Sequence, residues 1–362
     1  MPARGSIPAQ ASAFRSPLPA FLASQPAAAS RAPSRNADLA LFGDTLAARI
    51  AERQSQIVLG LDPHPAALWP GIRGGAESLS GQENAGFVRS EDVPGVAGAV
   101  LGHCLALIDA VAPACLAVKL QLACFERLGP PGAAALVAVA DHARAHGLLV
   151  IADGKRGDID VTAVAYAQAL FGGLEIPPLA VGGPETPLGA IGGLGVDIAT
   201  VNPLMGRDTV EPFIAAARLA GAGVLLLVRT SNPGAADVLD LELRGGGAVW
   251  ERLAVLVREL GQAGVGESGI SDVGAVVGAT APEHLARARE LMPRAPFLLP
   301  GVGAQGGRVE DLAAAFAPGR AGGLIAASRS IAGAHLLTGG DPAAAARAEA
   351  ERLRAAAWDL VS

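Results

Sequence analysis

The chain has 362 residues, of which 51% are apolar and 17% are charged, and its formal net charge is −6. This length and apolar content are sufficient for one large α/β barrel or for two smaller domains. A mildly acidic chain without basic blocks does not match proteins that bind nucleic acid through charge. No run of about 18 or more uncharged apolar residues is present, so the sequence predicts no membrane span.

Lysine is almost absent from the chain. Of the 28 basic residues, all are arginine except Lys119 and Lys155, although lysine is normally among the commonest residues. A lysine can release a proton when its surroundings tune its pKa, whereas arginine stays charged. The two lysines are therefore candidates for positions that arginine cannot fill, with chance survival as the alternative.

The first part of the chain differs in composition from the rest. Residues 1–36 contain six prolines, six serines, four arginines and no acidic residue. This composition predicts a disordered extension, with a targeting segment as the alternative, and residues 37–362 are expected to form a single domain. Three cysteines without metal-site spacing, Cys104, Cys115 and Cys124, are expected to be buried thiols in a reducing compartment, the cytoplasm.

From Leu39 onward, short continuous apolar runs alternate with helical segments, the first of which begins at Phe42. Continuous runs are typical of parallel strands that are buried on both faces. Eight strands in alternation with helices predict a (β/α)₈ barrel, with a doubly wound open sheet as the competitor. The expected strands are Ile57–Leu61, Cys115–Leu120, Leu148–Ala152, Ile198–Val201, Val224–Val228, Ala275–Gly278, Phe297–Leu299 and Gly323–Ala327. The expected helices include Ala133–His146, Val161–Phe171, Glu211–Leu219, Val249–Gln262 and Pro282–Leu291.

Three connections between these elements are long. Residues 70–94 and 230–247 follow the first and fifth strands, on the C-terminal face where barrel enzymes carry their sites. Residues 172–196 are rich in glycine and proline and precede the fourth strand. They therefore belong to the opposite face, where we expect no chemistry.

The strongest functional signal follows the third strand. Asp153 leaves this strand, Lys155 comes two residues later and Asp158 three residues further. If the strand continues to residue 155, its period of two places Asp153 and Lys155 on the same side. Lys119 ends the neighbouring strand and would complete a network of two ammonium and two carboxylate groups. Such charges persist in a dry pocket only when they are paired, and the network can keep a lysine protonated and ready to donate. A surface salt-bridge loop is the alternative.

Two further signals also follow strands. The glycine-rich turn Pro300–Gly307 comes after the seventh strand and Arg329 after the eighth, which matches the phosphate site common in barrels. Glycines let backbone N–H groups approach an anion, and arginine adds a bidentate clamp. Gln305 could bridge to another part of the ligand, and Ser231 could hydrogen-bond a heterocycle. Flexible turns with exposed polar side chains are the alternative for each element.

Other residues carry weaker signals. His142 and His146 stand four apart on one predicted helix, which is compatible with a metal pair, but no third ligand is evident from the sequence. We therefore expect them to form a solvated face away from the site. His64 is expected to belong to a fixed turn, and Tyr166, on a predicted helix, to be part of the core.

The segment Asp153-Gly-Lys-Arg-Gly-Asp-Ile159 resembles the DxKxxDI signature of the orotidine 5′-phosphate decarboxylase family. The motif alone is shared with related phosphosugar decarboxylases and synthases, whereas its combination with the Ser231 and Gln305 loops is specific to the decarboxylases. The similarity covers about residues 39–358, and Leu120 departs from it by standing where proline is expected. The runs that resemble the longer bacterial (type 2) subgroup are Gly60–Pro65, Ala117–Gln121, Val201–Pro203, Arg229–Gly234, Pro300–Gly307 and Ala327–Ile331.

The resemblance implies roles for the site residues. Lys119, Asp153, Lys155 and Asp158 would form the catalytic charge network. Asp158 and Thr162 would reach into the site of a partner subunit, so that the active form is a homodimer. The implied substrate contacts are Asp62 and Lys119 with the ribose, Ser231 with the pyrimidine, and Pro300, Gly303, Gln305 and Arg329 with or beside the phosphate.

The implied reaction is the removal of CO₂ from C6 of orotidine 5′-phosphate to give uridine 5′-phosphate in de novo pyrimidine biosynthesis, without a metal or organic cofactor. Lys155 would stabilise the carbanion at C6 and then protonate it, and Asp153 would face the leaving carboxylate. A magnesium-dependent phosphosugar decarboxylase or aldol-type synthase using Asp153 and Asp158 is one alternative. A Schiff-base aldolase using Lys155 and a nucleotide sensor without turnover are the others.

Overall fold

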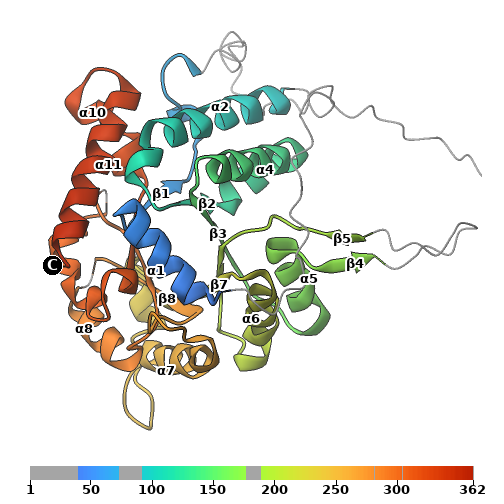
Figure 1. Ribbon diagram of the computed structural model, residues 1–362, viewed down its shortest axis with the longest axis vertical. Coiled ribbons are helices and arrows are strands. Elements are labelled where there is room, and N and C mark those ends of the chain that lie inside the picture. Colours follow the sequence, from blue (N-terminus) through green and yellow to red (C-terminus); the bar gives the residue numbers. More distant parts are fainter. Residues whose placement is uncertain (1–39, 73–91, 177–188, 281, 304, 362) are drawn as a thin grey trace, which may run out of the picture.

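The computed structural model describes residues 40–72, 92–176, 189–280, 282–303 and 305–361. Within them, eight parallel strands pair in the order β1-β10-β9-β8-β7-β6-β3-β2 and close into a barrel, because β1 pairs with both β2 and β10. The predicted barrel is confirmed, and the open sheet is excluded (Figure 1). The barrel strands are β1 (Ile57–Leu61), β2 (Ala117–Gln121), β3 (Leu149–Arg156), β6 (Ile198–Val201), β7 (Gly223–Arg229), β8 (Val273–Val277), β9 (Phe297–Pro300) and β10 (Gly323–Ala327).

The third predicted strand differs most from the structure. β3 ends at Arg156, four residues beyond the predicted end, whereas the other predicted strand ends are at most two residues off. Its last paired residue on the β2 side is Asp153, and its register with β6 shifts between Ala152 and Arg156. The polar residues 153–156 therefore belong to the strand itself, which an apolar pattern could not indicate.

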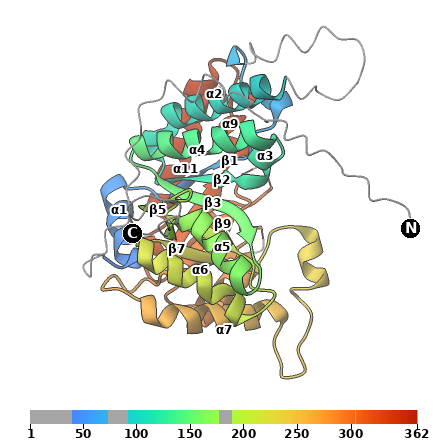
Figure 2. The ribbon, with the colours of Figure 1, turned by 90° about the vertical axis from the view of Figure 1, so that its right-hand side faces the viewer.

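Helices surround the barrel on the outside (Figures 1 and 2). α4 begins four residues earlier than predicted, because Pro130 and Pro131 fit the first turn of a helix. One helix with its following turn, Val93–Ala114, is long and apolar enough to cross a membrane, and 61% of its apolar window is buried inside the protein. The helices are α1 (Phe42–Arg53), α2 (Val93–Val111), α3 (Leu122–Glu126), α4 (Gly129–Ala145), α5 (Asp160–Phe171), α6 (Arg207–Ala220), α7 (Val249–Gly261), α8 (Pro282–Leu291), α9 (Arg329–Ala332), α10 (His335–Thr338) and α11 (Pro342–Asp359).

Several sequence expectations concern the segments outside the barrel strands. The expected disordered extension, residues 1–36, lies outside the described residues, as does most of the long connection after β1. In the connection before β6, β4 (Leu174–Ile176) and β5 (Gly189–Ile191) pair in antiparallel fashion, which the sequence analysis did not predict. The expectation that Tyr166 is part of the core is wrong. Tyr166 is 37% exposed on α5, and its ring lies beside the guanidinium of Arg156.

Helix α1 closes the N-terminal end of the barrel. Phe42, Leu46 and Ile50 are buried on one face of α1. Gly43 lies so close to the carbonyl oxygen of Ile270 that a Cβ atom would be 2.0 Å away, so only glycine permits this approach. These three side chains form one apolar cluster with buried residues of the barrel, which include Val58, Leu116, Leu225, Leu298 and Leu324. Among the described residues, α1 thus fills this end of the barrel, and the cavity described below lies at the C-terminal end.

Arginine performs structural tasks in this lysine-poor chain. Arg289 of α8 is 6% exposed, and its guanidinium lies over the ring of Phe297. Burial lowers the pKa of Arg289 to about 9. Its nitrogens donate hydrogen bonds of 2.5–2.9 Å to four carbonyl oxygens, those of Met292, Ala295, Ala315 and Gly322. One side chain thus ties α8 to the two 3₁₀ turns that precede β10.

The closure by α1 can be tested with Leu46→Ala. Leu46 is fully buried, so the substitution removes apolar contacts and leaves a cavity, which costs about 2–5 kcal/mol of unfolding free energy. Urea denaturation measures the loss. The matched control is Leu337→Ala at a 91% exposed position, where we expect a change within about 0.5 kcal/mol. Equal effects of the two substitutions would contradict the closure.

Candidate active site

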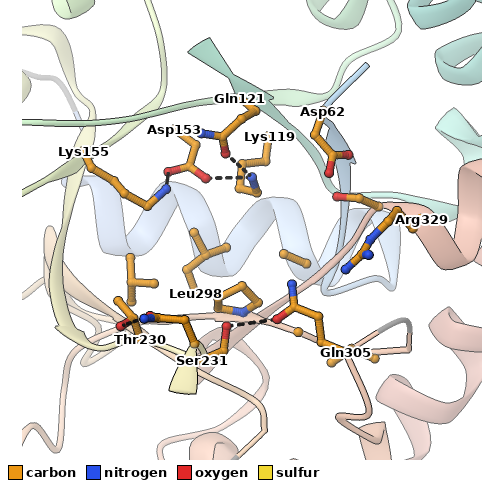
Figure 3. A pocket seen from close by; sticks show the side chains of 17 residues that line it. Asp62, Lys119, Gln121, Asp153, Lys155, Thr230, Ser231, Leu298, Gln305 and Arg329 are labelled. Carbon is orange, nitrogen blue, oxygen red and sulfur yellow. Dashed lines mark hydrogen bonds and ion pairs between the residues drawn. The ribbon is translucent and has the colours of Figure 1, made fainter. Parts of the chain in front are cut away.

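The C-terminal end of the barrel contains a cavity of about 450 Å³. Its floor is apolar and includes Val276, Leu298 and Ala326 from three strands, whereas its walls are polar (Figure 3). Most of the predicted site residues line this cavity: Asp62, Lys119, Asp153, Lys155, Ser231, Pro300, Gln305 and Arg329. The structure therefore brings together side chains from seven of the eight barrel strands or the loops that follow them.

A single carboxylate joins the two lysines of the chain. The Nζ atom of Lys119 lies 2.7 Å from Oδ2 of Asp153, and the Nζ atom of Lys155 lies 2.6 Å from Oδ1. The side chains of Lys119 and Asp153 are buried, whereas that of Lys155 is 40% exposed at the cavity. Figure 3 shows both ammonium groups converging on Asp153. Two ammonium groups share one carboxylate here. The three side chains together therefore carry a net positive charge, which suits an anionic ligand.

The same arrangement fixes the charge of Asp153. Burial alone would raise its pKa, but the ammonium groups of Lys119 and Lys155 outweigh burial and hold the pKa at about 2. Asp153 is therefore ionised at neutral pH. The pKa of Asp62, across the cavity, is raised by burial, although the positive charge of Lys119 acts in the opposite direction.

Lys155 has an unusual backbone conformation. Its φ angle is +48°, in the left-handed region that residues other than glycine rarely adopt. Its N–H donates to Oγ1 of Thr200 at 3.0 Å, and the Thr200 hydroxyl donates to Oδ1 of Asp153 at 2.9 Å. Asp153 and Lys155 meet as predicted, but through this irregular turn in β3 rather than through a regular strand. Such conformations cost about 1–3 kcal/mol and are typical of functional sites.

The glycine-rich loop after β9 packs against the start of α9. Gly303 has a φ angle of +79°, and a Cβ atom there would lie 2.8 Å from Cβ of Ser330, next to Arg329. Gly303 lies in the predicted loop but is not among the residues that line the cavity. The Ser231 hydroxyl donates to Oε1 of Gln305 at 3.1 Å. The two residues predicted to bind different parts of a ligand are thus linked side by side (Figure 3).

Besides Gly303, two predicted residues do not line the cavity, Asp158 and Thr162. The Asp158 carboxylate accepts a hydrogen bond from the N–H of Ile159, and Thr162 is exposed on the first turn of α5. Neither lines the cavity within a single chain.

Sequence reasoning missed several supporting residues. Thr200 follows two apolar residues of β6, and its polarity within a buried run was the available signal. Gln121 accepts a hydrogen bond from Lys119 at 3.3 Å. Trp69 donates its indole N–H to the carbonyl of Ala332 at 2.7 Å and so ties the loop after β1 to α9. No sequence spacing indicates that contact.

The third neighbour of His142 and His146, which was not evident from the sequence, is present in the structure. Asp109 of α2 contacts both rings, because α2 packs against α4. The expectation that His64 belongs to a fixed turn is confirmed, since its Nδ1 accepts a hydrogen bond from the N–H of Ala66.

Comparison with known proteins agrees with this geometry. Residues 55–348 match the model of the orotidine 5′-phosphate decarboxylase / HUMPS family. The chain belongs to this family. Orotidine 5′-phosphate decarboxylase from Rhodopirellula baltica is 40% identical over 294 residues, which cover 81% of this chain and 89% of the relative. The Deinococcus radiodurans enzyme of the same name is 46% identical over 228 residues, 63% of this chain and 75% of that protein.

A solved structure shows the same architecture. The orotidine monophosphate decarboxylase of Leishmania donovani superposes with a TM-score of 0.60 at 28% identity, covering 88% of this chain and 99% of that one. Membership of the orotidine 5′-phosphate decarboxylase family, with relatives that carry the name of the enzyme, makes the chain a decarboxylase of the carboxy-lyase class.

The charge of Asp153 predicts a pH-dependent contribution to stability. A pKa lowered from 3.8 to about 2 stabilises the folded state by about 2 kcal/mol above pH 5, and this contribution is lost as the pH falls towards 2. Asp153→Asn cannot titrate. The difference in unfolding free energy between wild type and variant should therefore shrink by about 1 kcal/mol from pH 6 to pH 3. Denaturant titrations at several pH values measure it, and a pH-independent difference would contradict the proposed charge state.

Proposed function

We propose that the chain decarboxylates orotidine 5′-phosphate to uridine 5′-phosphate in de novo pyrimidine biosynthesis, with Lys155 as the proton donor. The observation that carries this proposal is the convergence of Lys119 and Lys155 on Asp153 at the end of the barrel opposite to the end that α1 fills. A cavity of about 450 Å³ is in the usual range for a small-molecule ligand.

The polar groups of the cavity suggest how the nucleotide is oriented. Arg329 and the Gly303 loop are suited to the phosphate, since an arginine and glycine-rich backbone bind phosphate oxygens well. Asp62 and Lys119 are assigned to the ribose hydroxyls. The linked pair Ser231 and Gln305 offers both donors and acceptors at the pyrimidine and beside the phosphate, and Pro300 forms part of the wall between them.

In the proposed reaction, the bond between C6 and the carboxylate carbon breaks and CO₂ leaves. The electron pair stays on C6, and the Lys155 ammonium transfers its proton there to give the product. Before transfer, the positive charge of Lys155 stabilises the developing carbanion. Asp153 faces the departing carboxylate and keeps the lysine oriented through the 2.6 Å contact. This assignment uses the charge network and includes no metal or organic cofactor.

The proton-donor role is tested by Lys155→Arg. Arginine keeps the positive charge but does not release a proton at neutral pH, so turnover should fall by roughly 10²-fold or more. The loss of absorbance of orotidine 5′-phosphate measures turnover, with and without EDTA. We expect wild-type turnover to be insensitive to EDTA.

The matched control for that variant is Arg156→Lys, the reverse exchange at the next residue. Arg156 pairs with Glu126 and lies outside the cavity lining, so turnover should change little. Near-normal turnover in Lys155→Arg would contradict the proton-donor role. Turnover that depends on a divalent metal would favour a phosphosugar-type enzyme instead.

We further propose a homodimer in which Asp158 and Thr162 complete the partner's site. Two observations support it. Both residues lie outside the cavity of their own chain. They also stand among exposed apolar side chains, including Val161 at 81% and Leu204 at 72% exposure, and such a patch is typical of an interface. Helices α5 and α6 lie side by side (Figure 2). An apolar groove of about 250 Å³ between them continues this surface.

Mixing two inactive variants tests the contribution of Asp158 to the partner's site. Lys155→Ala and Asp158→Ala chains should each be nearly inactive. A mixed dimer would hold one intact site, built from the intact Lys155 of one chain and the intact Asp158 of the other. Random exchange of equal amounts should therefore restore about one quarter of wild-type activity. No recovery, with exchange verified by differently tagged chains, would place Asp158 in its own subunit's site.

The free cysteines are consistent with a cytoplasmic location, which we also propose. Cys104 and Cys115 are buried thiols and Cys124 is half-buried, a state that a reducing compartment maintains. In this proposal, residues 37–362 are the catalytic domain and residues 1–36 an appended extension.

A further inference from the structure

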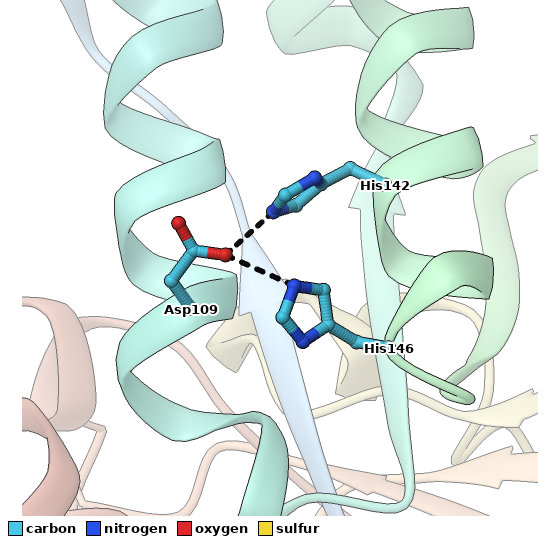
Figure 4. Close-up of side chains that lie close together, drawn as sticks. All are labelled: Asp109, His142 and His146. Atoms are coloured by element: carbon cyan, nitrogen blue, oxygen red, sulfur yellow. Dashed lines mark hydrogen bonds and ion pairs between the residues drawn. The ribbon is translucent and has the colours of Figure 1, made fainter.

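A cluster of two histidines and one aspartate lies on the outside of the barrel, far from the catalytic chemistry. Asp109 stands in the last turn of α2, and His142 and His146 stand at the end of α4 (Figure 4). These helix ends lead into the first residues of β2 and β3, at the N-terminal end of the barrel. The active-site cavity opens at the opposite end of the same strands.

The three side chains are directed at one point. Oδ1 of Asp109 lies 2.7 Å from Nε2 of His142 and 3.0 Å from Nε2 of His146. Both rings turn the same nitrogen towards the carboxylate, and their Nδ1 atoms point away from it (Figure 4). The ring centroids are 4.7 Å apart. The potential ligand atoms of the three residues all lie within 4.8 Å of one another.

We propose that Asp109, His142 and His146 bind a divalent transition-metal ion of the zinc type. Imidazole nitrogens and a carboxylate oxygen are ligands that zinc, copper and nickel ions take, whereas magnesium and calcium prefer oxygen ligands. Tetrahedral bonds of about 2.0–2.1 Å place ligand atoms roughly 3.3 Å apart. The observed nitrogen–oxygen distances of 2.7 and 3.0 Å are close to this value, so slight rotations of the side chains admit the ion.

Binding also requires a change of tautomer. Without an ion, each Nε2 carries hydrogen and donates it to Asp109. With an ion, the hydrogen of each neutral ring moves to Nδ1, and Nε2 supplies its lone pair to the metal. The side chains are 56%, 29% and 35% exposed for Asp109, His142 and His146 respectively. Solvent can therefore deliver the ion and occupy the fourth position.

The ion would join two helices that are distant in sequence. Its ligands come from α2 and α4, which pack against each other. A ligand that binds only the folded state stabilises it, so zinc should raise the melting temperature of the chain. Turnover of orotidine 5′-phosphate should not depend on the ion, because the cluster is at the other end of the barrel.

The experiment is a calorimetric titration of the full chain, freed of metal, with Zn²⁺, and with Mg²⁺ for comparison. We expect saturable binding of one Zn²⁺ per chain and none of Mg²⁺. His146→Gln removes an imidazole ligand and Asp109→Asn removes the negative charge of the oxygen ligand, so each should weaken zinc binding by more than the roughly tenfold that loss of an outer contact costs. Both positions are on the surface, and circular dichroism checks that the variants fold.

The matched control is Asp141→Asn, which alters an exposed acid on α4 that pairs with Arg144 and should leave the affinity unchanged.

With Cu²⁺ as the probe, the electron paramagnetic resonance spectrum should show coupling to two nitrogens in the wild type and to one in His146→Gln. Zinc affinity that is equal in wild type and His146→Gln, or no binding up to millimolar Zn²⁺, would overturn the proposal. Either result is independent of whether the chain decarboxylates its substrate.

Discussion

The rest of the site depends on one carboxylate shared by two ammonium groups. Asp153 can be buried as an anion only because Lys119 and Lys155 flank it at 2.7 and 2.6 Å. This contact in turn depends on the register of two strands. Gln121 pairs with Asp153 across β2 and β3, and Lys119 pairs with Ile151, so a slip of one residue would turn the charged side chains away from the barrel interior. The strand register that closes the barrel is therefore also the register that brings these charges together.

The N-terminal end of the barrel contributes mainly to stability, whereas the C-terminal end carries the candidate site. At the N-terminal end, α1 fills the interior with apolar side chains and a glycine contact that tolerates no Cβ atom. At the C-terminal end, the strands end in groups that would be costly to bury without partners, and Lys155 adopts a strained backbone conformation. A barrel can hold such a strained and charged end because the apolar interior and the opposite end over-determine its shape.

Much of this arrangement could be predicted from the sequence, and the omissions have physical reasons. Continuous apolar runs predicted the strands, and the scarcity of lysine pointed to Lys119 and Lys155. The register of β3 with β6 shifts at the left-handed turn of Lys155, where the backbone N–H of Lys155 donates to the hydroxyl of Thr200. No local sequence pattern encodes this shift. Asp109 was missed beside His142 for a related reason. The two are 33 residues apart on separate helices, and their contact is a product of helix packing.

The use of arginine at structural positions has a chemical consequence. Arg289 satisfies four carbonyl oxygens at once, a task for which the three donors of an ammonium group are too few. With arginine in such places, the side-chain amines of the chain are reduced to two. One of them, Lys119, is shielded in the barrel, whereas Lys155 is 40% exposed to the cavity. Among the two side-chain amines, Lys155 is therefore the one that an amine-selective reagent can reach, so that such a reagent would attach a label at the cavity.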